Sequence, residues 1–331
     1  MLLTPRSSSV EFAPTKRLQL YAGRSHPELA NEVAAHLGVA LGNPNLVDFA
    51  SGEIRARFGE SVRGSDVFIL QTHAHPNEHI MEQLIMIDAA KRASAKRITA
   101  VCPYFGYARQ DRKSDGREPI SAKLMADMLT VAGADRVVSL DLHSGQIQGF
   151  FDIPVDHLTG MPVLVNHLRY AIGPGCVVVS PDSGRVKVAE RFAKHLDADV
   201  ASVYKRRSTS QLNSVEALDI MGEVAGRTCV IVDDMVDTAG TLTAAAALLK
   251  KAGALEVYAA VTHGVLSGPA IERIRDSELT KLVITNTLPL SIEKRSDKIE
   301  VLSVAPLLAD AISAVFEDAS VSEIFNGENQ T

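Results

Sequence analysis

Three aspartates stand near the end of one predicted strand, and a turn of small residues follows them. The apolar run 230–232 ends in Asp233 and Asp234, and Asp237 precedes a Thr-Ala-Gly-Thr turn that opens an alanine-rich helix. Small residues let a phosphate reach the backbone N–H groups of such a turn, and the positive end of the helix dipole favours the anion. Carboxylates, by contrast, accept hydrogen bonds from sugar hydroxyls. The segment therefore predicts a site for a phosphorylated sugar, with these members: Asp233, Asp234, Asp237, Thr238, Ala239, Gly240 and Thr241.

A simpler interpretation of the same turn is that Asp237 and Thr238 only cap the helix. Capping leaves Asp233 and Asp234 without a role, so we prefer the binding interpretation. Two common phosphate and dinucleotide motifs are excluded, because neither GxxxxGK followed by Ser or Thr nor GxGxxG occurs in the sequence.

A segment rich in aromatic and charged residues occupies positions 103–112 after another predicted strand. Arg109 is a fixed cation that can clamp phosphates, and Gln110 can hydrogen-bond a nucleotide. A charged loop facing solvent is the alternative, but the neighbouring Tyr104, Phe105 and Tyr107 predict that the segment packs against the protein.

Other polar side chains also follow predicted strands. Lys205 and Arg207 come after residues 200–204, and they are either a basic patch facing solvent or cations that act on a phosphoryl group. His143 and Asp182 each stand shortly after a strand. A histidine in such a place is often only a structural hydrogen-bonding residue, so His143 by itself is a weak indication of a site.

The elements that position these residues alternate between short β-branched runs and amphipathic stretches, which predicts an α/β fold with mostly parallel sheets. The predicted strands are residues 17–21, 66–71, 97–101, 136–140, 176–180, 200–204, 228–232, 257–261 and 282–285. The predicted helices are residues 27–37, 80–92, 120–132, 185–196 and 241–251. On the second helix, Met81, Leu84 and Ile85 are expected to share the apolar face.

The pattern starts again near residues 160–163, where Thr-Gly-Met-Pro interrupts it, so two units of similar size are expected. We expect one domain at residues 17–160, with 306–325 packing back on it, and a second domain at 161–305. The ends, 1–16 and 326–331, are polar and are expected to be flexible.

Composition excludes several classes of protein. The 331 residues carry a net charge of −6, from 34 basic and 40 acidic residues, which argues against nucleic-acid binding. No apolar stretch approaches the roughly 20 residues of a membrane span, and residues 1–16 lack the apolar core of a signal peptide. Cys102, Cys176 and Cys229 are scattered without a CxxC pair, so buried thiols are expected rather than disulfides or zinc ligands. A cytoplasmic protein without nucleic-acid or membrane partners is expected.

The segment 230–241 resembles the phosphoribosyl-diphosphate loop shared by phosphoribosyltransferases and ribose-phosphate diphosphokinases. Other segments resemble the bacterial class I diphosphokinases: FASGE at 49–53, PYFGYARQDR at 103–112, SLDLHSGQIQGFF at 139–151, VSPDSG at 179–184 and YKRR at 204–207. The resemblance extends from about residue 18 to 325. It implies two phosphoribosyltransferase-like domains, each a mostly parallel sheet flanked by helices.

In that family, the β,γ-diphosphate of ATP moves to the anomeric hydroxyl of ribose 5-phosphate. The products are AMP and 5-phospho-α-D-ribose 1-diphosphate, which feeds nucleotide, histidine and tryptophan synthesis. The resemblance implies Mg²⁺ near His143 and Asp182, and it implies Lys205 and Arg207 as catalytic residues, with Arg207 also binding ribose 5-phosphate. The implied ATP site, to which a neighbouring subunit contributes the first four residues, is formed by Phe49, Ser51, Gly52, Glu53, Arg109 and Gln110.

Relatives of this type form hexamers in which an anion site between subunits responds to inorganic phosphate and ADP. The members of such a site here would be Arg63, Ser320, Ser322 and Phe325. Asp115 stands where many relatives have an arginine, and an acid repels phosphate, so weakened phosphate activation is expected.

The chain departs from the family pattern at three more places. Arg185 stands where many relatives have a second glycine, Ser51 stands where many have Asp or Asn, and the stretch after Arg207 is slightly longer. Two alternatives remain. A non-catalytic regulatory homologue would typically have lost the Lys205 loop and the sugar-phosphate loop, and a phosphoribosyltransferase would not need the segment 103–112. A repressor built on this fold would need an added DNA-binding domain, for which the residues before the first strand are too few.

Overall fold

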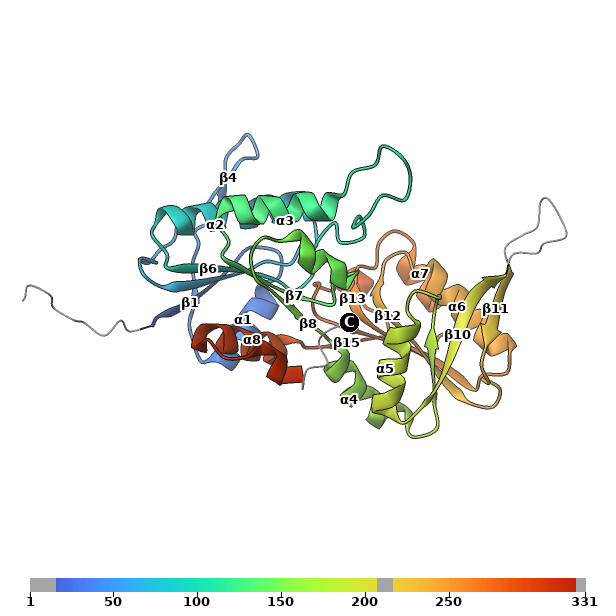
Figure 1. The fold of residues 1–331 in the computed structure, drawn as a ribbon. Coiled ribbons are helices and arrows are strands. Elements are labelled where there is room, and N and C mark those ends of the chain that lie inside the picture. The colour runs from blue at the N-terminus through green and yellow to red at the C-terminus, as the bar shows by residue number, and fades with distance from the viewer. Residues whose placement is uncertain (1–15, 207–216, 326–331) are drawn as a thin grey trace, which may run out of the picture.

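The computed structural model describes residues 16–206 and 217–325, which form two α/β units lying next to each other (Figure 1). Each unit has a central, mostly parallel sheet with helices packed on both faces. The predicted fold class is therefore confirmed. Among the described helices, none combines the length and the apolar character that crossing a bilayer requires.

Within the described residues, the first sheet has six strands, all parallel, in the order β2-β1-β5-β6-β7-β8. Their bounds are Leu41–Gly42 (β2), Leu18–Ala22 (β1), Asp66–Leu70 (β5), Arg97–Cys102 (β6), Arg136–Leu140 (β7) and Val155–Leu158 (β8). Helices α2 (Pro76–Arg92) and α3 (Ser121–Ala132) cover one face, and α1 (Pro27–Leu37) lies on the other. A short antiparallel pair, β3 (Val47–Asp48) and β4 (Ile54–Arg55), projects from this unit.

The second sheet has seven strands among the described residues, in the order β11-β10-β9-β12-β13-β14-β15, and only the β10–β11 pair is antiparallel. Their bounds are Ala217–Met221 (β11), Asp199–Arg206 (β10), Val177–Ser180 (β9), Thr228–Val236 (β12), Glu256–Gly264 (β13), Lys281–Thr285 (β14) and Ile299–Leu302 (β15). Helices α4 (Met161–Ile172) and α5 (Val186–Leu196) cover one face, and α6 (Gly240–Lys251) and α7 (Ala270–Arg275) cover the other.

Strand β12 shows why these runs form central strands. Residues Cys229, Val230, Ile231 and Val232 are fully buried, and their side chains alternate between the two apolar clusters above and below the sheet. A parallel strand with helices on both faces buries both sets of side chains, so its sequence reads as a continuous apolar run.

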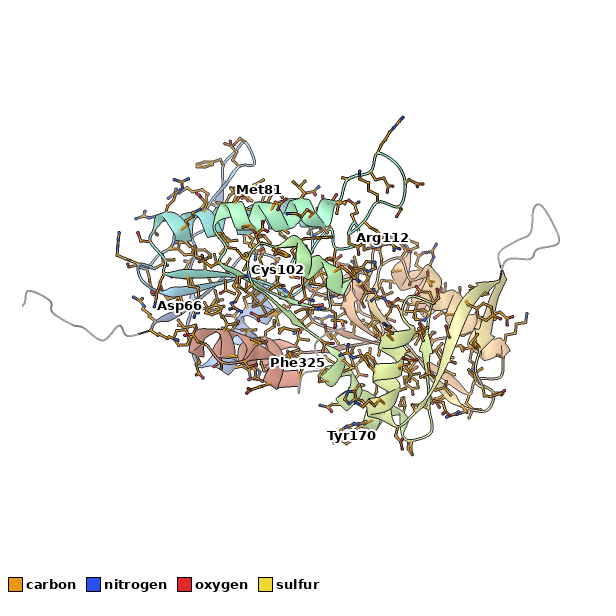
Figure 2. The ribbon with its side chains drawn as sticks, viewed as in Figure 1. Asp66, Met81, Cys102, Arg112, Tyr170 and Phe325 are labelled. Carbon is orange, nitrogen blue, oxygen red and sulfur yellow. The ribbon has the colours of Figure 1, made fainter. Side chains whose placement is uncertain are left out.

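The last helix, α8 (Ala305–Glu317), returns to the first unit (Figure 1). Its residues Leu308 and Ile312 are fully buried in a cluster with Leu29 and Val33 of α1. A 3-10 helix, Val321–Phe325, follows and ends with a buried Phe325 (Figure 2). This packing supports the division into 17–160 with 306–325, and 161–305, which we keep as a proposal. The expected flexible ends lie outside the described residues, except for Lys16, which bonds the carbonyl oxygen of Phe316 at 3.0 Å.

Two details of the predicted elements are wrong. Strand β12 continues to Val236, so Asp233 and Asp234 lie within the strand rather than after it. On α2, Met81 is half exposed (Figure 2), whereas the polar Glu82 and Gln83 are fully buried. The prediction selected the wrong face because it considered only apolar residues. Glu82 and Gln83 are buried because they form hydrogen bonds with Gln71 and with the carbonyl oxygen of Ile69.

Candidate active site

A cavity of about 220 Å³ lies where the two units meet, beside the C-terminal ends of β7, β9 and β12. In open parallel sheets this is the edge at which ligands bind, because the connections from several strands converge there. The cavity is lined by Arg109, His143, Asp182, Arg185 and the continuous segment 233–242. All seven residues predicted for the phosphorylated sugar therefore line one cavity, together with Arg109, His143 and Asp182.

The turn between β12 and α6 bends sharply just before the helix begins. Ala239 precedes the helix with φ of 61°, in the left-handed region, and this brings the chain round sharply into Gly240. Arg273 of α7 donates a hydrogen bond of 3.0 Å to the carbonyl oxygen of Thr238, which holds the outside of the turn. The N–H groups at the start of α6 are the donors that an anion would meet.

Asp237 connects the two units. Its Oδ2 accepts a hydrogen bond from Nη1 of Arg109 at 2.7 Å, and its Oδ1 accepts one from the hydroxyl of Ser267. The side chain of Arg109 is 58% exposed. Because an exposed ion pair contributes little stability, Arg109 can leave Asp237 for a phosphate at small cost.

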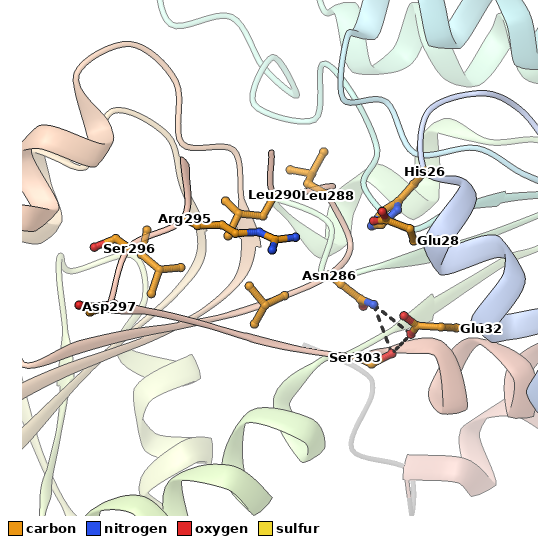
Figure 3. Close-up of a pocket in the computed structure, with 12 residues that line it drawn as sticks. His26, Glu28, Glu32, Asn286, Leu288, Leu290, Arg295, Ser296, Asp297 and Ser303 are labelled. Carbon is orange, nitrogen blue, oxygen red and sulfur yellow. Dashed lines mark hydrogen bonds between the residues drawn. The ribbon is translucent and has the colours of Figure 1, made fainter. Parts of the chain in front are cut away.

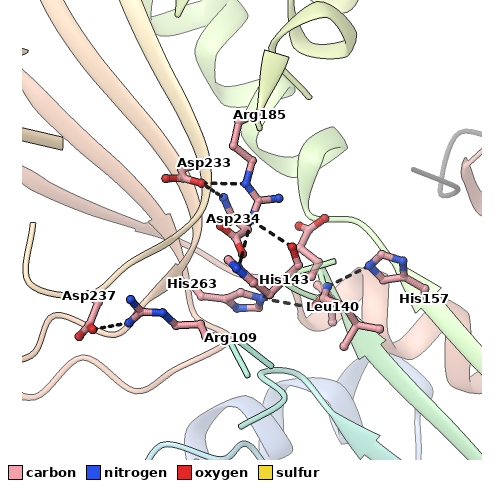
Figure 4. A network of polar contacts seen from close by, with 11 residues as sticks. Arg109, Leu140, His143, His157, Arg185, Asp233, Asp234, Asp237 and His263 are labelled. Atoms are coloured by element: carbon pink, nitrogen blue, oxygen red, sulfur yellow. Dashed lines mark hydrogen bonds and ion pairs between the residues drawn. The ribbon is translucent and has the colours of Figure 1, made fainter. Parts of the chain in front are cut away.

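The acidic pair of β12 forms a network with His143 and Arg185 (Figure 4). Asp234 accepts from Nδ1 of His143 at 2.8 Å and from Nη2 of Arg185 at 2.6 Å. Nε of Arg185 lies 3.3 Å from Oδ1 of Asp233. The sequence predicted that Arg185, a departure from the family, would alter the rim of the pocket, but it did not predict the bonds to Asp233 and Asp234.

The environments of the two acids differ. Burial, followed by the charge of Asp234, raises the pKa of Asp233 to about 8, against the opposing effect of Arg185. Burial also acts to raise the pKa of Asp234, but the hydrogen bond with His143 and the charge of Arg185 outweigh it and lower that pKa to about 2. Asp234 is therefore the member of the pair that stays ionised.

The residues expected to hold Mg²⁺ lie on the wall of the cavity. Asp182 is exposed there, and its Oδ1 accepts from the backbone N–H of Gly184 at 2.8 Å. With Nδ1 bonded to Asp234, His143 keeps Nε2 for a ligand or water. No cluster of three or more His, Cys, Asp or Glu side chains is arranged to hold a metal in the described part of the chain. The donor set fits an ion that phosphate oxygens and water complete, which is how Mg²⁺ is usually bound beside nucleotides.

The segment that carries Arg109 is anchored by a buried histidine that sequence reasoning missed. Nδ1 of His73 accepts from the backbone N–H of Gly106 at 2.9 Å, and Nε2 lies 2.9 Å from Oε1 of Gln83. Gln110 accepts a hydrogen bond from the hydroxyl of Ser121 and does not line the cavity. In the sequence, His73 is recognisable as a polar residue shortly after β5, but no sequence pattern indicates that position 73 contacts position 106.

A second missed histidine joins the two units. His263, at the end of β13, is fully buried, with Nδ1 2.9 Å from Oγ1 of Thr287 and Nε2 3.2 Å from the carbonyl oxygen of Leu140. Oγ1 of Thr72 also donates to the carbonyl oxygen of Thr287 at 2.6 Å. These bonds join the end of β7 in the first unit to the end of β13 in the second.

Some predicted site residues lie elsewhere. Lys205 is in β10, its side chain lies outside what the structure describes, and Arg207 falls outside the described residues altogether. The four adenine-site residues are exposed on the β3–β4 turn and do not line the cavity of their own chain: Phe49, Ser51, Gly52 and Glu53. The Ser51 hydroxyl donates to Glu53 at 3.0 Å.

The residues expected to form an anion site are only partly brought together. Ser320 and Ser322, whose hydroxyls are 2.9 Å apart, line a separate cavity of about 410 Å³ near Arg136. Arg63 is exposed and Phe325 is buried in the core, and neither lines that cavity.

A larger cavity, of about 590 Å³, lies between the start of α1 and the β14–β15 region (Figure 3). Glu32 reaches into it and accepts hydrogen bonds from Asn286 at 3.3 Å and Ser303 at 2.5 Å. None of the predicted site residues lines it, so size alone does not identify the site.

Comparisons with known proteins agree with this geometry. Residues 18–133 match the family described as the N-terminal domain of ribose phosphate pyrophosphokinase, and residues 209–326 match the phosphoribosyl synthetase-associated domain. The ribose-phosphate pyrophosphokinase of Bifidobacterium longum is 53% identical over 325 residues, which are 97% of this chain and 96% of that protein. The protein of the same name from Corynebacterium glutamicum is 55% identical over 317 residues, which are 95% and 97% of the two chains.

A solved structure extends the likeness to the whole fold. The crystal structure of phosphoribosylpyrophosphate synthetase from Mycobacterium smegmatis has a TM-score of 0.86 at 53% identity, and the match covers 92% of this chain and 100% of that one. Sequence identity above 50% extends over nearly the full length of these relatives. A phosphoribosyltransferase would share only the sugar-phosphate loop, so that alternative is excluded. The chain belongs to the ribose-phosphate pyrophosphokinase family.

Proposed function

We propose that this chain is a ribose-phosphate diphosphokinase, a transferase of nucleotide biosynthesis that moves the β,γ-diphosphate of ATP to the anomeric hydroxyl of ribose 5-phosphate. One observation carries the proposal. The turn 237–241 and the Asp233–Asp234 pair of one unit face Arg109 and His143 of the other across a single cavity. A site for a phosphorylated sugar thus adjoins a cation suited to nucleotide phosphates.

Ribose 5-phosphate binds with its phosphate on the N–H groups of residues 238–241, where the start of α6 favours an anion. Its hydroxyls form hydrogen bonds with the carboxyl groups of Asp233 and Asp234, directly or through water. Arg207, which follows β10 along the chain, supplies a cation to the sugar phosphate, as the resemblance implies. The backbone of the described turn supports the first of these contacts.

ATP binds beside Arg109, which exchanges its contact with Asp237 for the nucleotide phosphates. The adenine is held by Phe49, Ser51, Gly52 and Glu53 of a neighbouring subunit. Their exposure on the β3–β4 turn, away from the cavity of their own chain, supports this arrangement. Ser51 offers the adenine a hydroxyl where relatives offer a carboxylate or an amide, so its contact is weaker.

In the reaction, a bond forms between the anomeric oxygen and the β-phosphorus as the bond from the β-phosphorus to the oxygen of the α-phosphate breaks. The anomeric hydroxyl loses its proton, and AMP leaves with the bridging oxygen. Charge collects on the phosphoryl oxygens, so catalysis depends mainly on positioning and on cations. Lys205 and Arg207 supply cations to the migrating group.

Mg²⁺ is the proposed cofactor, and when bound it neutralises charge on the phosphates. Asp182 and His143 are the residues that hold it, directly or through water, and ATP phosphates complete the set. Asp182 and His143 both line the cavity, which supports this role.

We also propose a cytoplasmic homohexamer with an anion site that includes Arg63, Ser320, Ser322 and Phe325. The cavity beside Ser320 and Ser322 supports that site. Asp115 belongs to the loop between β6 and α3 and weakens activation by inorganic phosphate. Sedimentation velocity reports the hexamer, and a phosphate titration of the rate reports the activation; full, tight activation would contradict the role of Asp115.

The test of the activity uses purified protein with ATP, Mg²⁺ and ribose 5-phosphate, and it follows AMP and phosphoribosyl diphosphate by chromatography. We expect AMP only when the sugar is present, in a one-to-one ratio with phosphoribosyl diphosphate. Folded protein that forms no AMP, even with added phosphate, would favour the non-catalytic regulatory homologue.

A further inference from the structure

Arg185 makes several contacts in the site that the sequence did not predict. It stands directly before α5, and its side chain, only 18% exposed, extends back toward the end of β12 (Figure 4). A buried guanidinium is costly unless several acceptors surround it, so its partners indicate what the residue is for.

Three residues meet the guanidinium, and they come from both units. Nη2 of Arg185 lies 2.6 Å from Oδ1 of Asp234 and 3.2 Å from both the carbonyl oxygen and the ring Nδ1 of His143. Nε lies 3.3 Å from Oδ1 of Asp233. The side chain of His143 closes the set through its 2.8 Å contact with Asp234. His143 follows β7 of the first sheet, whereas the two aspartates belong to the second.

The two acids are engaged to different extents. Both carboxylate oxygens of Asp234 are bonded, one to Arg185 and one to His143, and its side chain is 7% exposed. On Asp233, Arg185 and the backbone N–H of Asp234 both contact Oδ1, and the side chain is 26% exposed. Asp234 is thus held inside the network, and Asp233 is the acid that presents an oxygen to the cavity.

We propose that Arg185 is a positioning residue that fastens the His143 segment of the first unit to the Asp233–Asp234 pair of the second, so that binding of nucleotide and binding of sugar favour each other. The inference rests on the proposed function. Nucleotide bound beside His143 strengthens the contact between His143 and Arg185, and the same guanidinium holds Asp233 in place for the sugar. Sugar bound at Asp233 acts through the same two contacts in the opposite direction. A glycine at this position has no side chain to make that connection.

The planar fork of arginine is necessary for this role. Its Nε and Nη2 atoms point at two carboxylates and a carbonyl oxygen at once, while a lysine ammonium is a single point charge on a flexible stem. Arg185→Lys is therefore expected to keep the charge and lose the connection.

The experiment measures the affinity for ribose 5-phosphate by calorimetry, with and without α,β-methylene ATP, in the presence of Mg²⁺. The ratio of the two dissociation constants is the coupling factor, which is reciprocal between the ligands. We expect a factor of about ten or more in the wild type and of about one to two in Arg185→Gly. Lys187→Ala, an exposed position on the same helix with no recorded ion pair in the described structure, is the matched control and should keep the wild-type factor.

A wild-type coupling factor in folded Arg185→Gly would overturn the proposal, and so would one in Arg185→Lys. If the glycine variant does not fold, the lysine variant carries the test alone. Wild-type protein that forms AMP from ATP and ribose 5-phosphate but has a coupling factor of one rejects the role of Arg185 only. Wild-type protein that forms no AMP rejects the proposed function instead.

Discussion

Lys205 pairs with Leu218 in β10, and that strand ends one residue later at Arg206. We expect Lys205→Ala to lower turnover about 10² to 10³-fold, because one cation aimed at a developing phosphoryl charge contributes about that much. The measurement is the initial rate of AMP formation, with the melting temperature as a check on folding. Lys251→Ala, at the exposed end of α6, is the control. Near-normal turnover of the Lys205 variant would remove this residue from the mechanism.

The three cysteines are expected to be unreactive in the native protein. Burial raises the pKa of Cys102 to about 12 and that of Cys229 to about 11, and it also raises the pKa of Cys176. Because the thiolate is the reactive form, iodoacetamide at pH 8 should label none of them before denaturation and all three afterwards. Mass spectrometry counts the adducts, and a native adduct would show that the labelled cysteine becomes accessible.

At the scale of elements, α2 supports the loop that carries Arg109. Gln83 of this helix donates to the carbonyl oxygen of Ile69 at 3.2 Å and contacts His73, which in turn holds Gly106. Burial lowers the pKa of His73 to about 4. The neutral ring is needed because Nδ1 must accept the hydrogen bond from Gly106.

The low pKa of His73 predicts a loss of stability in mild acid. Unfolded histidine titrates near pH 6.5, so below that pH the unfolded chain binds a proton that the folded chain does not. The stability contributed by neutral His73 is present above about pH 6.5 and is lost as the pH falls toward about 4. Between pH 6.5 and 5.5 this one group should cost about 1 kcal/mol.

The control is His73→Asn, whose side-chain oxygen can accept from Gly106 but cannot titrate. Thermal unfolding of both proteins across this range should show the steeper decline in the wild type. The neighbouring titratable groups, His79 and Cys102, are common to both proteins and cancel in the comparison. Parallel declines would mean that His73 does not titrate as expected.

At the scale of the whole molecule, hydrogen bonds between the two units hold the two sheets together beside the cavity, and we call this group of bonds the joint. The joint consists of His263, Thr287 and Thr72, with a further bond of 2.6 Å from Thr262 to Asp141. The bonds of Thr287 and Thr72 are buried and that of Thr262 is partly buried, and an unmade hydrogen bond in the interior is costly.

Thr72→Val should destabilise the protein by about 1–3 kcal/mol, because it leaves the buried carbonyl oxygen of Thr287 without this donor. Thr130→Val is the matched control. Its hydroxyl donates to Ala126 within one helix at a partly exposed position, so a change within about 0.5 kcal/mol is expected. Calorimetry of both variants gives the comparison, and equal effects would show that the joint is no more important than a surface bond.

The sequence alone placed together those candidate site residues that are contiguous. The turn 237–241 and the acids before it form one short segment, and that segment lines a single cavity. The bounds of β7 and α1 were also predicted correctly, because a buried strand and an amphipathic helix carry their own periodicity.

Tertiary structure alone decided which face of α2 is buried and which residues connect the units. Glu82 is buried because Arg24, 58 positions away, and Gln71, 11 positions away, bond it at 2.5 and 2.8 Å. Arg185 enters the site because β9 and β12 are neighbours in the sheet and the His143 segment of the other unit packs against them. These contacts join residues that are 11 to 58 positions apart. No local pattern encodes them, because each depends on where the other strand or helix comes to lie.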